Sequence, residues 1–316
     1  MESTVFSIII PAYNIAGYIE KCVKSVCPLE SYEEVIIVDD GSTDETGEIC
    51  DRLARSDEKI RVIHKKNGGL SSARNKGLEA ACGKYVIFID GDDYIDRNVL
   101  ASIKDRIDSE PDVVFCDAVK VWENGRRKPM GDGVTGEIDD LRGAELFRYL
   151  SQLNKFPAAA WGKAFRRVFL LENALTFREG ILSEDIEWSL RLYPKVDRAV
   201  YCDDVMYYYR QDRTGSITFS RGARHAMDIL NTVEEYSAGL SRMKADGAQD
   251  DRGNALIELY GSFLEYELRV LLLKRNDVKP ADAYDFRKRL KNLKKLTGYR
   301  KDIKSRVVAV LYRVLI

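Results

Sequence analysis

The sequence predicts an α/β fold with a doubly wound, mostly parallel central sheet flanked by helices, followed by an all-helical C-terminal extension. Residues 5–11 form an uninterrupted apolar run, as expected of a parallel strand that is buried on both faces. Similar runs alternate with helically spaced segments over the first ninety residues, which is typical of βαβ units. Beyond residue 222 only helical spacing remains.

The order of elements follows from these patterns. Segment 41–44 is a turn that also caps the next helix, and Gly83 ends the helix before residue 85. We expect strands at 5–11, 35–40, 60–64, 85–90, 111–121 and 199–210. We expect helices at 17–26, 45–56, 70–82, 141–153, 184–192, 223–245, 254–274, 281–295 and 301–316. The predicted domains are 1–220 and 221–316.

Composition restricts the function. The chain has 316 residues, of which 45% are hydrophobic and 32% charged, as in soluble globular proteins. Six cysteines without a Cys-x-x-Cys pair argue against a disulfide frame or a zinc site, and two histidines make a His-based site improbable. No signal peptide or membrane span is recognised, so a cytoplasmic location is expected.

Charge is distributed unevenly. Residues 287–316 hold eleven Lys or Arg and one acid, Asp302, while the overall charge is −1. The basic segment can dock on an anionic membrane surface with its apolar residues inserted, form an arm of a helical bundle, or pack on a second subunit in a homodimer. No nucleic-acid partner is expected, because the acidic body would repel phosphates.

The most informative stretch is 85–93, an apolar run that ends in Asp90, Gly91, Asp92 and Asp93. A strand here delivers three carboxylates to the sheet edge where open α/β folds bind ligands. Clustered carboxylates repel one another unless a cation neutralises them, and Mg²⁺ or Mn²⁺ suits such oxygen ligands. The alternative is an acidic turn that only caps the next helix.

Three further segments come to the same region. They are 7–14, which ends in Pro11, Ala12, Tyr13 and Asn14; 38–44, which contains Asp40; and 67–75, which opens a helix and contains Arg74. Helix N–H groups and Arg74 favour an anion, Tyr13 can lie against a base, and Asp40 can accept a base N–H. Together they can hold a nucleoside diphosphate, although each alone has a structural explanation.

In these motifs the sequence resembles the GT-A-fold glycosyltransferases of family 2, particularly bacterial enzymes that build capsular polysaccharide or exopolysaccharide. The resemblance covers roughly residues 5–220. It rests on six motifs in the family's order, at 7–14, 38–44, 69–75, 88–93, 161–169 and 183–185.

The resemblance implies roles for individual residues. The nucleotide-sugar site would comprise Pro11, Ala12, Tyr13, Asn14, Asp40, Arg74, Asp90, Gly91 and Asp92. Asp92 and Asp93 would bind the metal, Mn²⁺ or Mg²⁺, and Asp185 would be the catalytic base. Trp161, Lys163 and Glu184 are acceptor-site candidates, although a Trp buried against the sheet is an equal alternative. Residues 207–210 with Arg213 and Ser216 resemble the segment that closes the donor site.

The resemblance also implies a reaction: inverting transfer of a hexosyl or N-acetylhexosaminyl group from a UDP-sugar to a hydroxyl of a growing, lipid-linked glycan. The Gln-x-x-Arg-Trp motif of processive synthases is absent, which favours one sugar per encounter. A nucleotidyltransferase is disfavoured because no Gly-rich basic loop follows the first strand. A catalytically inactive subunit that binds nucleotide sugar or scaffolds a synthase is the remaining alternative.

Overall fold

The structure is a computed structural model that describes residues 5–28, 30, 33–212, 223–247, 250–274, 280–296 and 299. The chain divides into two compact units that interleave along the sequence. The first unit comprises 1–140, 159–180 and 196–213, and the second comprises 141–158, 181–195 and 214–316. Segments 141–158 and 181–195 thus group with the C-terminal helices. The domain boundary expected near residue 220 stays a prediction.

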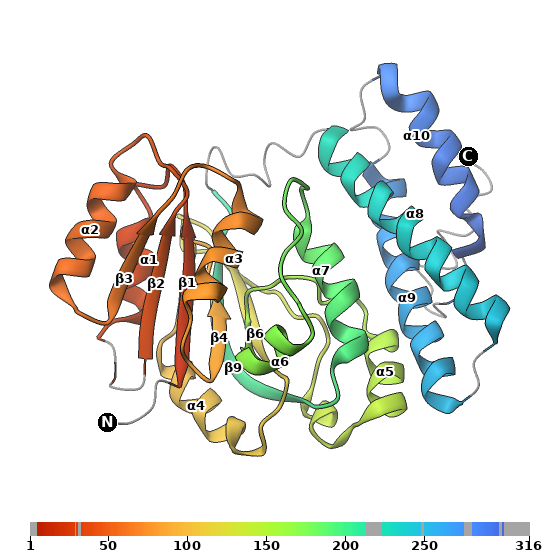
Figure 1. The fold of residues 1–316 in the computed structure, drawn as a ribbon, viewed down its shortest axis with the longest axis horizontal. Coiled ribbons are helices and arrows are strands. Elements are labelled where there is room, and N and C mark those ends of the chain that lie inside the picture. The colour runs from red at the N-terminus through yellow and green to blue at the C-terminus, as the bar shows by residue number, and fades with distance from the viewer. Residues whose placement is uncertain are drawn as a thin grey trace. The chain divides into compact units, whose positions relative to one another are not determined.

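The first half of the first unit contains the predicted parallel strands. They are β1 (Phe6–Ala12), β2 (Glu33–Asp39), β3 (Ile60–His64) and β4 (Tyr85–Phe88), in the spatial order β3-β2-β1-β4 (Figure 1). Every residue of β1, β2 and β4 is buried, because helices cover both faces of this part of the sheet. This burial on both faces explains the uninterrupted apolar runs in the sequence.

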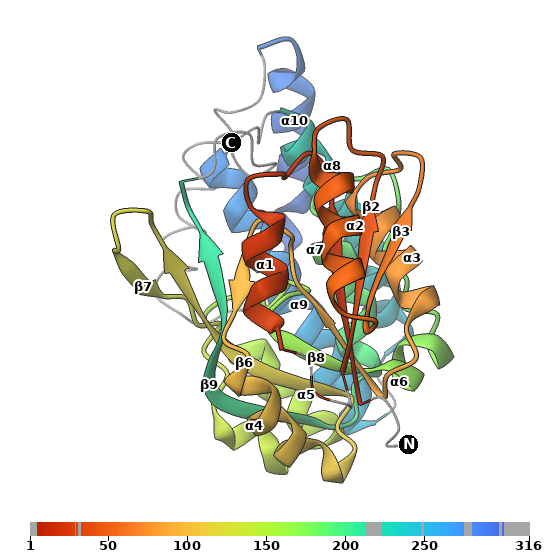
Figure 2. The same ribbon diagram turned by 90° about the vertical axis from the view of Figure 1, so that its left-hand side faces the viewer.

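Helices cover the two faces as a doubly wound sheet requires. Helices α1 (Ile19–Val26) and α2 (Thr46–Ser56) lie on one face, and α3 (Leu70–Ala80) lies on the other (Figure 2). The approach of α3 is close: a Cβ at Gly77 would come within 2.3 Å of Ile9 Cγ2. A glycine at this position lets the helix pack directly on β1.

The second half of the sheet is mixed. Strand β8 (Lys163–Arg166) pairs antiparallel with both β4 and β6 (Val113–Val121), while β9 (Ala199–Arg210) pairs parallel with β6. The full order is β3-β2-β1-β4-β8-β6-β9-β5, with β7 paired to β6. The α/β fold class is confirmed. The sequence did not reveal β5 (Tyr94–Ile95), β7 (Arg127–Pro129), β8, α4 (Asn98–Arg106) and α6 (Arg167–Glu172).

The second unit is helical in its described residues. It contains α5 (Gly143–Gln152), α7 (Glu184–Leu192), α8 (Ala223–Asp246), α9 (Asp251–Lys274) and α10 (Pro280–Asn292), with short turns at Tyr193–Lys195 and Leu293–Leu296. Helix α5 packs on α9, and Phe156, Tyr193 and Phe263 form an aromatic cluster. Helices α8, α9 and α10 agree with the helical pattern that the sequence shows after residue 222, and α5 and α7 agree with the helices expected at 141–153 and 184–192.

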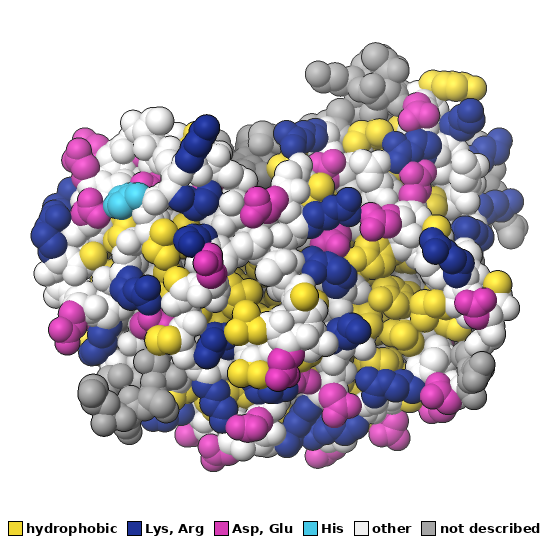
Figure 3. Space-filling view, viewed as in Figure 1, with side chains coloured by type: hydrophobic (Ala, Val, Ile, Leu, Met, Phe, Trp, Pro, Cys, Tyr) yellow, Lys and Arg dark blue, Asp and Glu magenta, His cyan; other side chains and the backbone are white. Residues whose placement is uncertain are grey.

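The described part of the basic segment is an arm of this helical unit. Phe286, Leu290 and Leu293 are buried, and the Arg289 guanidinium lies 2.6 Å from Glu234 on α8. Residues 301–316, on which the expectation of membrane docking depends, lie outside the described residues, so docking stays a prediction. Among the described helices, none has the length and apolar content needed to span a bilayer. On the face drawn in Figure 3, positive and negative side chains are interspersed.

Candidate functional site

The acidic turn lies directly after β4, at the carboxyl end of the strand, as predicted. The Asp93 N–H donates to the Asp90 carbonyl at 2.9 Å, which closes the turn. Gly91 sits against the end of β1, where a Cβ would come within 2.5 Å of Ile15 Cδ1 and 2.8 Å of the Pro11 carbonyl oxygen. The glycine is therefore required for the acidic turn to approach the β1 end.

Asp93 points into the protein. Its carboxyl group is buried, and it accepts hydrogen bonds from the Tyr207 hydroxyl at 2.7 Å and from the Arg210 N–H at 2.8 Å. Burial, and then the neighbouring charges of Asp92 and Asp90, raise the pKa of Asp93 well above its usual value. Both β9 contacts fix the inner side of the acidic turn.

Asp90, at the other end of the acidic turn, forms an ion pair with Arg74 on α3. The Arg74 guanidinium is 1% exposed and donates to Asp90 Oδ1 at 2.7 Å, while its planar group lies 5.1 Å from the Phe177 ring. The Asp90 side chain keeps 23% of its surface exposed. Arg74 therefore contacts the acidic turn itself, and its predicted direct contact with a nucleotide stays a prediction.

The acidic turn has the donor chemistry for a divalent cation. Asp90 and Asp92 are both partly exposed and offer hard carboxylate oxygens, whereas Asp93 is buried. The metal contact predicted for Asp93 stays a prediction. In the described part of the chain, no three His, Cys, Asp or Glu side chains are grouped to hold a metal by themselves. This donor set fits an ion of the Mg²⁺ type, which commonly binds one or two carboxylates and completes its shell with substrate phosphates and water.

Asp40 organises the loop that leads into α3. Its carboxylate accepts from Lys65 Nζ at 2.5 Å, from the Gly68 N–H at 2.9 Å and from the Gly69 N–H at 2.7 Å. The Gly68 and Gly69 N–H groups, which precede α3, thus bind Asp40. The Gly68 N–H also lies 3.2 Å from Oδ2, so each oxygen of the carboxylate already accepts two hydrogen bonds. The predicted contact of Asp40 with a base N–H stays a prediction.

The loop after β1 is tied to the loop after β2. The Asn14 side-chain oxygen accepts from the Thr43 N–H at 2.8 Å, and the Asn14 N–H donates to Ser42 Oγ at 3.1 Å. Asn14 has a φ of 49°, a left-handed conformation that asparagine tolerates better than most residues. Tyr13 is 46% exposed beside this anchor, so its ring is accessible to a planar ligand.

His64, at the end of β3, is hydrogen-bonded to two carboxylates, and nothing in the sequence indicated this arrangement. His64 Nδ1 lies 2.9 Å from Asp39 Oδ2, and Nε2 lies 3.0 Å from Asp51 Oδ1. Hydrogen bonds to Asp51 and then to Asp39 raise the pKa of His64. Burial raises the pKa of Asp39, but the bonds from Ser42 and His64 outweigh it and lower that pKa overall.

The two acceptor candidates in the first unit line a pocket. Trp161 stacks on Tyr207 with 4.5 Å between ring centroids and on Tyr209 with 5.6 Å, so its indole packs against β9. Lys163 is 3% exposed, and its ammonium donates to the Ala159 carbonyl at 2.7 Å. Their acceptor roles stay predictions.

Glu184 and Asp185 belong to the second unit, at the first turn of α7. Glu184 is buried and Asp185 is half-buried. The preceding Ser183 has a φ of 63°, and its hydroxyl lies 2.5 Å from His225 Nδ1 on α8. The start of α7 is therefore fixed to α8, and the role of Asp185 as base stays a prediction.

Sequence reasoning missed the parts of the site that depend on pairing across the sheet. Tyr207 was placed on the correct strand, but nothing in its spacing shows that its hydroxyl meets Asp93. Lys65 is similarly an ordinary loop lysine until the fold brings it to Asp40. The segment with Arg213 and Ser216 lies outside the described residues.

Fold and site together define a class of protein: an α/β domain with an acidic turn at the carboxyl edge of its parallel strands. Residues 7–174 match the family described as Glycosyl transferase family 2. The chain belongs to this family.

Individual relatives support the assignment. The uncharacterised glycosyltransferase EpsJ of Bacillus subtilis is 33% identical over 211 residues, which cover 65% of this chain and 61% of EpsJ. The chain thus matches less than two thirds of that relative's length. The crystal structure of Staphylococcus aureus TarS 1–349 with UDP-GlcNAc has a TM-score of 0.70 and 22% identity, over 98% of this chain and 92% of that one. A Pyrobaculum calidifontis mannosyltransferase with GDP-Man and Mn²⁺ has a TM-score of 0.52 and 17% identity, over 99% and 85%.

Proposed function

We propose that the protein transfers a sugar from a UDP-sugar to a hydroxyl group of a growing glycan in surface polysaccharide synthesis. One observation carries the proposal: the acidic turn at the end of β4 is fixed between Arg74 and Tyr207, beside the β1 and β2 loops. Family membership supplies the reaction type. TarS, whose structure shares this fold, is a poly(ribitol-phosphate) β-N-acetylglucosaminyltransferase whose crystals contain UDP-GlcNAc, which supports a UDP-linked donor.

The donor would bind along the carboxyl edge of the parallel strands. The exposed Tyr13 ring is available to stack on a nucleobase, and Asp40 would accept a base N–H in place of one of the loop N–H groups that it binds. The diphosphate would then reach Asp90 and Asp92 at the next strand of the sheet. Asn14 ties the β1 loop to the β2 loop, and Pro11 and Ala12, at the end of β1, would line this edge.

The proposed metal is Mn²⁺ or Mg²⁺, held by Asp92 with Asp90 adjacent. A contact from the buried Asp93, which the resemblance also implies, remains part of the proposal. When bound, it would neutralise charge that develops on the diphosphate leaving group. Arg74 keeps Asp90 in place, and Tyr207 with the Arg210 N–H keeps Asp93 turned inward. The protein's own contacts thus hold the acidic turn between α3 and β9.

Asp185 is the proposed base. Inverting transfer needs one carboxylate to take the proton from the acceptor hydroxyl while its oxygen attacks the anomeric carbon. The anchored first turn of α7 would hold the carboxylate in a defined orientation. The proposal also includes a lipid-linked acceptor, docking of the basic segment on a membrane, and a homodimer. Binding experiments must test these three points.

The decisive experiment is a thermal-shift titration with UDP and UDP-sugars, in Mn²⁺ and in EDTA, on wild type, Asp92→Asn and Asp185→Asn. Ligand that binds only folded protein raises the melting temperature. We expect a metal-dependent shift that Asp92→Asn loses and Asp185→Asn keeps. The absence of a shift with every nucleotide would refute the donor site.

A second assay separates an enzyme from an inactive binding subunit. We expect wild type to release UDP slowly from a UDP-sugar, with or without a glycan acceptor. We expect no such release from Asp185→Asn when the acceptor is present. Binding without any release or transfer would favour the inactive subunit instead. Asp246→Asn, which changes an exposed carboxylate at the end of α8, controls for the loss of an acid in the second unit.

A further inference from the structure

Two cysteines that the proposed reaction does not use lie opposite each other in the sheet of the first unit. Cys116 on β6 and Cys202 on β9 are direct partners in the parallel register of these two strands. Neighbouring strands lie about 4.8 Å apart, and a disulfide joins residues whose Cα atoms are roughly 4.4–6.8 Å apart. The backbone therefore places the two cysteines at a separation that a disulfide can bridge.

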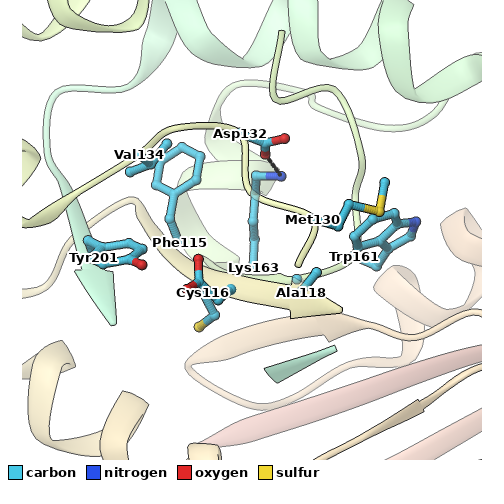
Figure 4. Close-up of a pocket in the computed structure, with 11 residues that line it drawn as sticks. Phe115, Cys116, Ala118, Met130, Asp132, Val134, Trp161, Lys163 and Tyr201 are labelled. Atoms are coloured by element: carbon cyan, nitrogen blue, oxygen red, sulfur yellow. Dashed lines mark ion pairs between the residues drawn. The ribbon is translucent and has the colours of Figure 1, made fainter. Parts of the chain in front are cut away.

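Both thiols lie on the same side of the sheet. Side chains alternate along a strand, and Phe115 and Tyr201, the residues just before the two cysteines, line the small pocket drawn in Figure 4. The Cys116 sulfur points away from Lys163 in that view. Cys202 belongs to a buried hydrophobic cluster, and Cys116 packs against the same cluster. The two thiols are thus neighbours on the core side of the strands.

The protonation of the pair suits it to react near neutral pH. A hydrogen bond from the Cys116 thiol lowers the pKa of Cys202 to about 7. The same hydrogen bond, together with burial, raises the pKa of Cys116 well above its usual value. The two sulfurs therefore share one proton around neutral pH, and a thiolate, which is the form that attacks oxidants, is available.

The pairing of β6 with β9 is interrupted just after these two residues. Asp117 on β6 pairs with Val205, so β9 bulges out between the cysteines and the next paired position. Beyond the bulge, β9 carries Tyr207 and Arg210, which both donate hydrogen bonds to Asp93. A covalent bond between the cysteines would therefore fix β9 to β6 where the regular ladder stops, ahead of the residues that hold the acidic turn.

We propose that Cys116 and Cys202 are a redox-sensitive pair that a peroxide converts to a reversible intramolecular disulfide. The inference does not depend on the proposed transferase function. It is compatible with the sequence, which shows no pattern of a permanent disulfide frame, because disulfides of reducing compartments are usually transient and redox-sensing.

The reaction begins at Cys116, because part of its surface is exposed whereas Cys202 is buried. The Cys116 proton passes to the Cys202 thiolate through their hydrogen bond, and the Cys116 sulfur attacks one peroxide oxygen. The S–O bond forms as the O–O bond breaks, and hydroxide leaves and is protonated by solvent.

The disulfide then forms within the pair. Cys202 gives up its proton and attacks the Cys116 sulfenic sulfur, so the S–S bond forms, the S–O bond breaks and a second water leaves. The two sulfurs together lose two electrons to the peroxide, which is reduced to two molecules of water.

The test is oxidation of the full chain with hydrogen peroxide, followed by thiol titration and peptide mass spectrometry. We expect the loss of two thiols per chain and a crosslinked peptide that joins Cys116 to Cys202, both reversed by dithiothreitol. The oxidised protein should have the higher melting temperature, because the crosslink restricts the unfolded chain. Cys82→Ser, which removes an exposed cysteine outside the pair, is the matched control and should behave as wild type in the crosslink and in the melting temperature.

Cys202→Ser tests the order of the two steps. We expect no crosslink in this variant, and we expect a sulfenic acid to accumulate at Cys116, where dimedone traps it. Cys202→Ala gives the same information if Cys202→Ser fails to fold.

Three results would overturn the inference. The first is retention of both thiols at peroxide concentrations that oxidise the exposed Cys82. The second is a disulfide that joins other cysteines in place of this pair. The third is a sulfinic acid at Cys116 without any crosslink in wild type, since Cys202 would then be unable to reach the oxidised sulfur.

Discussion

Tyr207 and Asp93 are joined by a hydrogen bond of 2.7 Å from the tyrosine hydroxyl to Oδ2, although 114 residues separate them in the sequence. The same hydroxyl accepts the Asp90 N–H at 3.2 Å. A single phenol thus holds both ends of the acidic turn. Its ring is fully buried beneath Trp161, so neither end of the contact can rotate away.

Replacement of Tyr207 by Phe removes this hydroxyl and keeps the ring. We expect the free energy of unfolding to fall by about 1–2 kcal/mol, because Asp93 and the Asp90 N–H both lose a buried partner. We also expect UDP to bind more weakly in Mn²⁺, because the acidic turn is less restricted. Urea denaturation and calorimetric titration measure the two effects. Tyr208→Phe, on the same strand, is the control, and equal effects of both variants would contradict the role given to Tyr207.

The Arg74–Asp90 ion pair is open to a double-mutant cycle. Arg74 is buried, so Arg74→Met leaves Asp90 without its cation and should cost about 3 kcal/mol in stability. Asp90→Asn alone leaves a buried guanidinium and should also destabilise. The double variant should recover part of the loss, giving a coupling energy of about 1–3 kcal/mol by urea denaturation. Additive losses would show that Arg74 acts through Phe177 packing instead.

Gly91 provides a steric test of the same turn. A methyl group there would come within 2.8 Å of the Pro11 carbonyl oxygen, which is backbone and cannot move aside cheaply. Gly91→Ala should therefore lower stability by about 1–3 kcal/mol and weaken UDP binding. Gly17→Ala is the matched control, since nothing lies within 4 Å of its Cβ position. A stable Gly91→Ala protein with unchanged UDP affinity would show that the turn can shift freely.

The parts of this site that the sequence predicted are those set by local pattern. Apolar runs fix where a parallel strand ends, so the positions of Asp40 and Asp90 at the sheet edge could be read directly. The side chains that bind these carboxylates could not be predicted, because Lys65, Arg74 and Tyr207 meet them only through tertiary packing. The short β8 was hidden for the same reason: its four residues pair antiparallel between β4 and β6, and they carry no alternating pattern.

The stability of the first unit should depend on pH through His64. Its pKa is raised in the folded protein by Asp51 and Asp39, so folding favours the protonated ring. The resulting stabilisation is complete below the unfolded pKa of about 6.5 and is lost as the pH rises through the higher folded pKa. Because the His64 side chain is 48% exposed, we expect less than about 1 kcal/mol.

Asp39 has the opposite dependence, because its pKa is lowered in the folded protein. Its stabilisation is present above the unfolded pKa of about 3.9 and is lost only as the pH falls through the lower folded value. The two groups together therefore predict that stability declines as the pH rises through the folded pKa of His64, where Asp39 contributes no change. Urea denaturation of wild type and His64→Gln between pH 6 and pH 9, on the order of one measurement per half unit, tests this. A difference between the two proteins that does not shrink as the pH rises would show that His64 stabilises the fold without its charge.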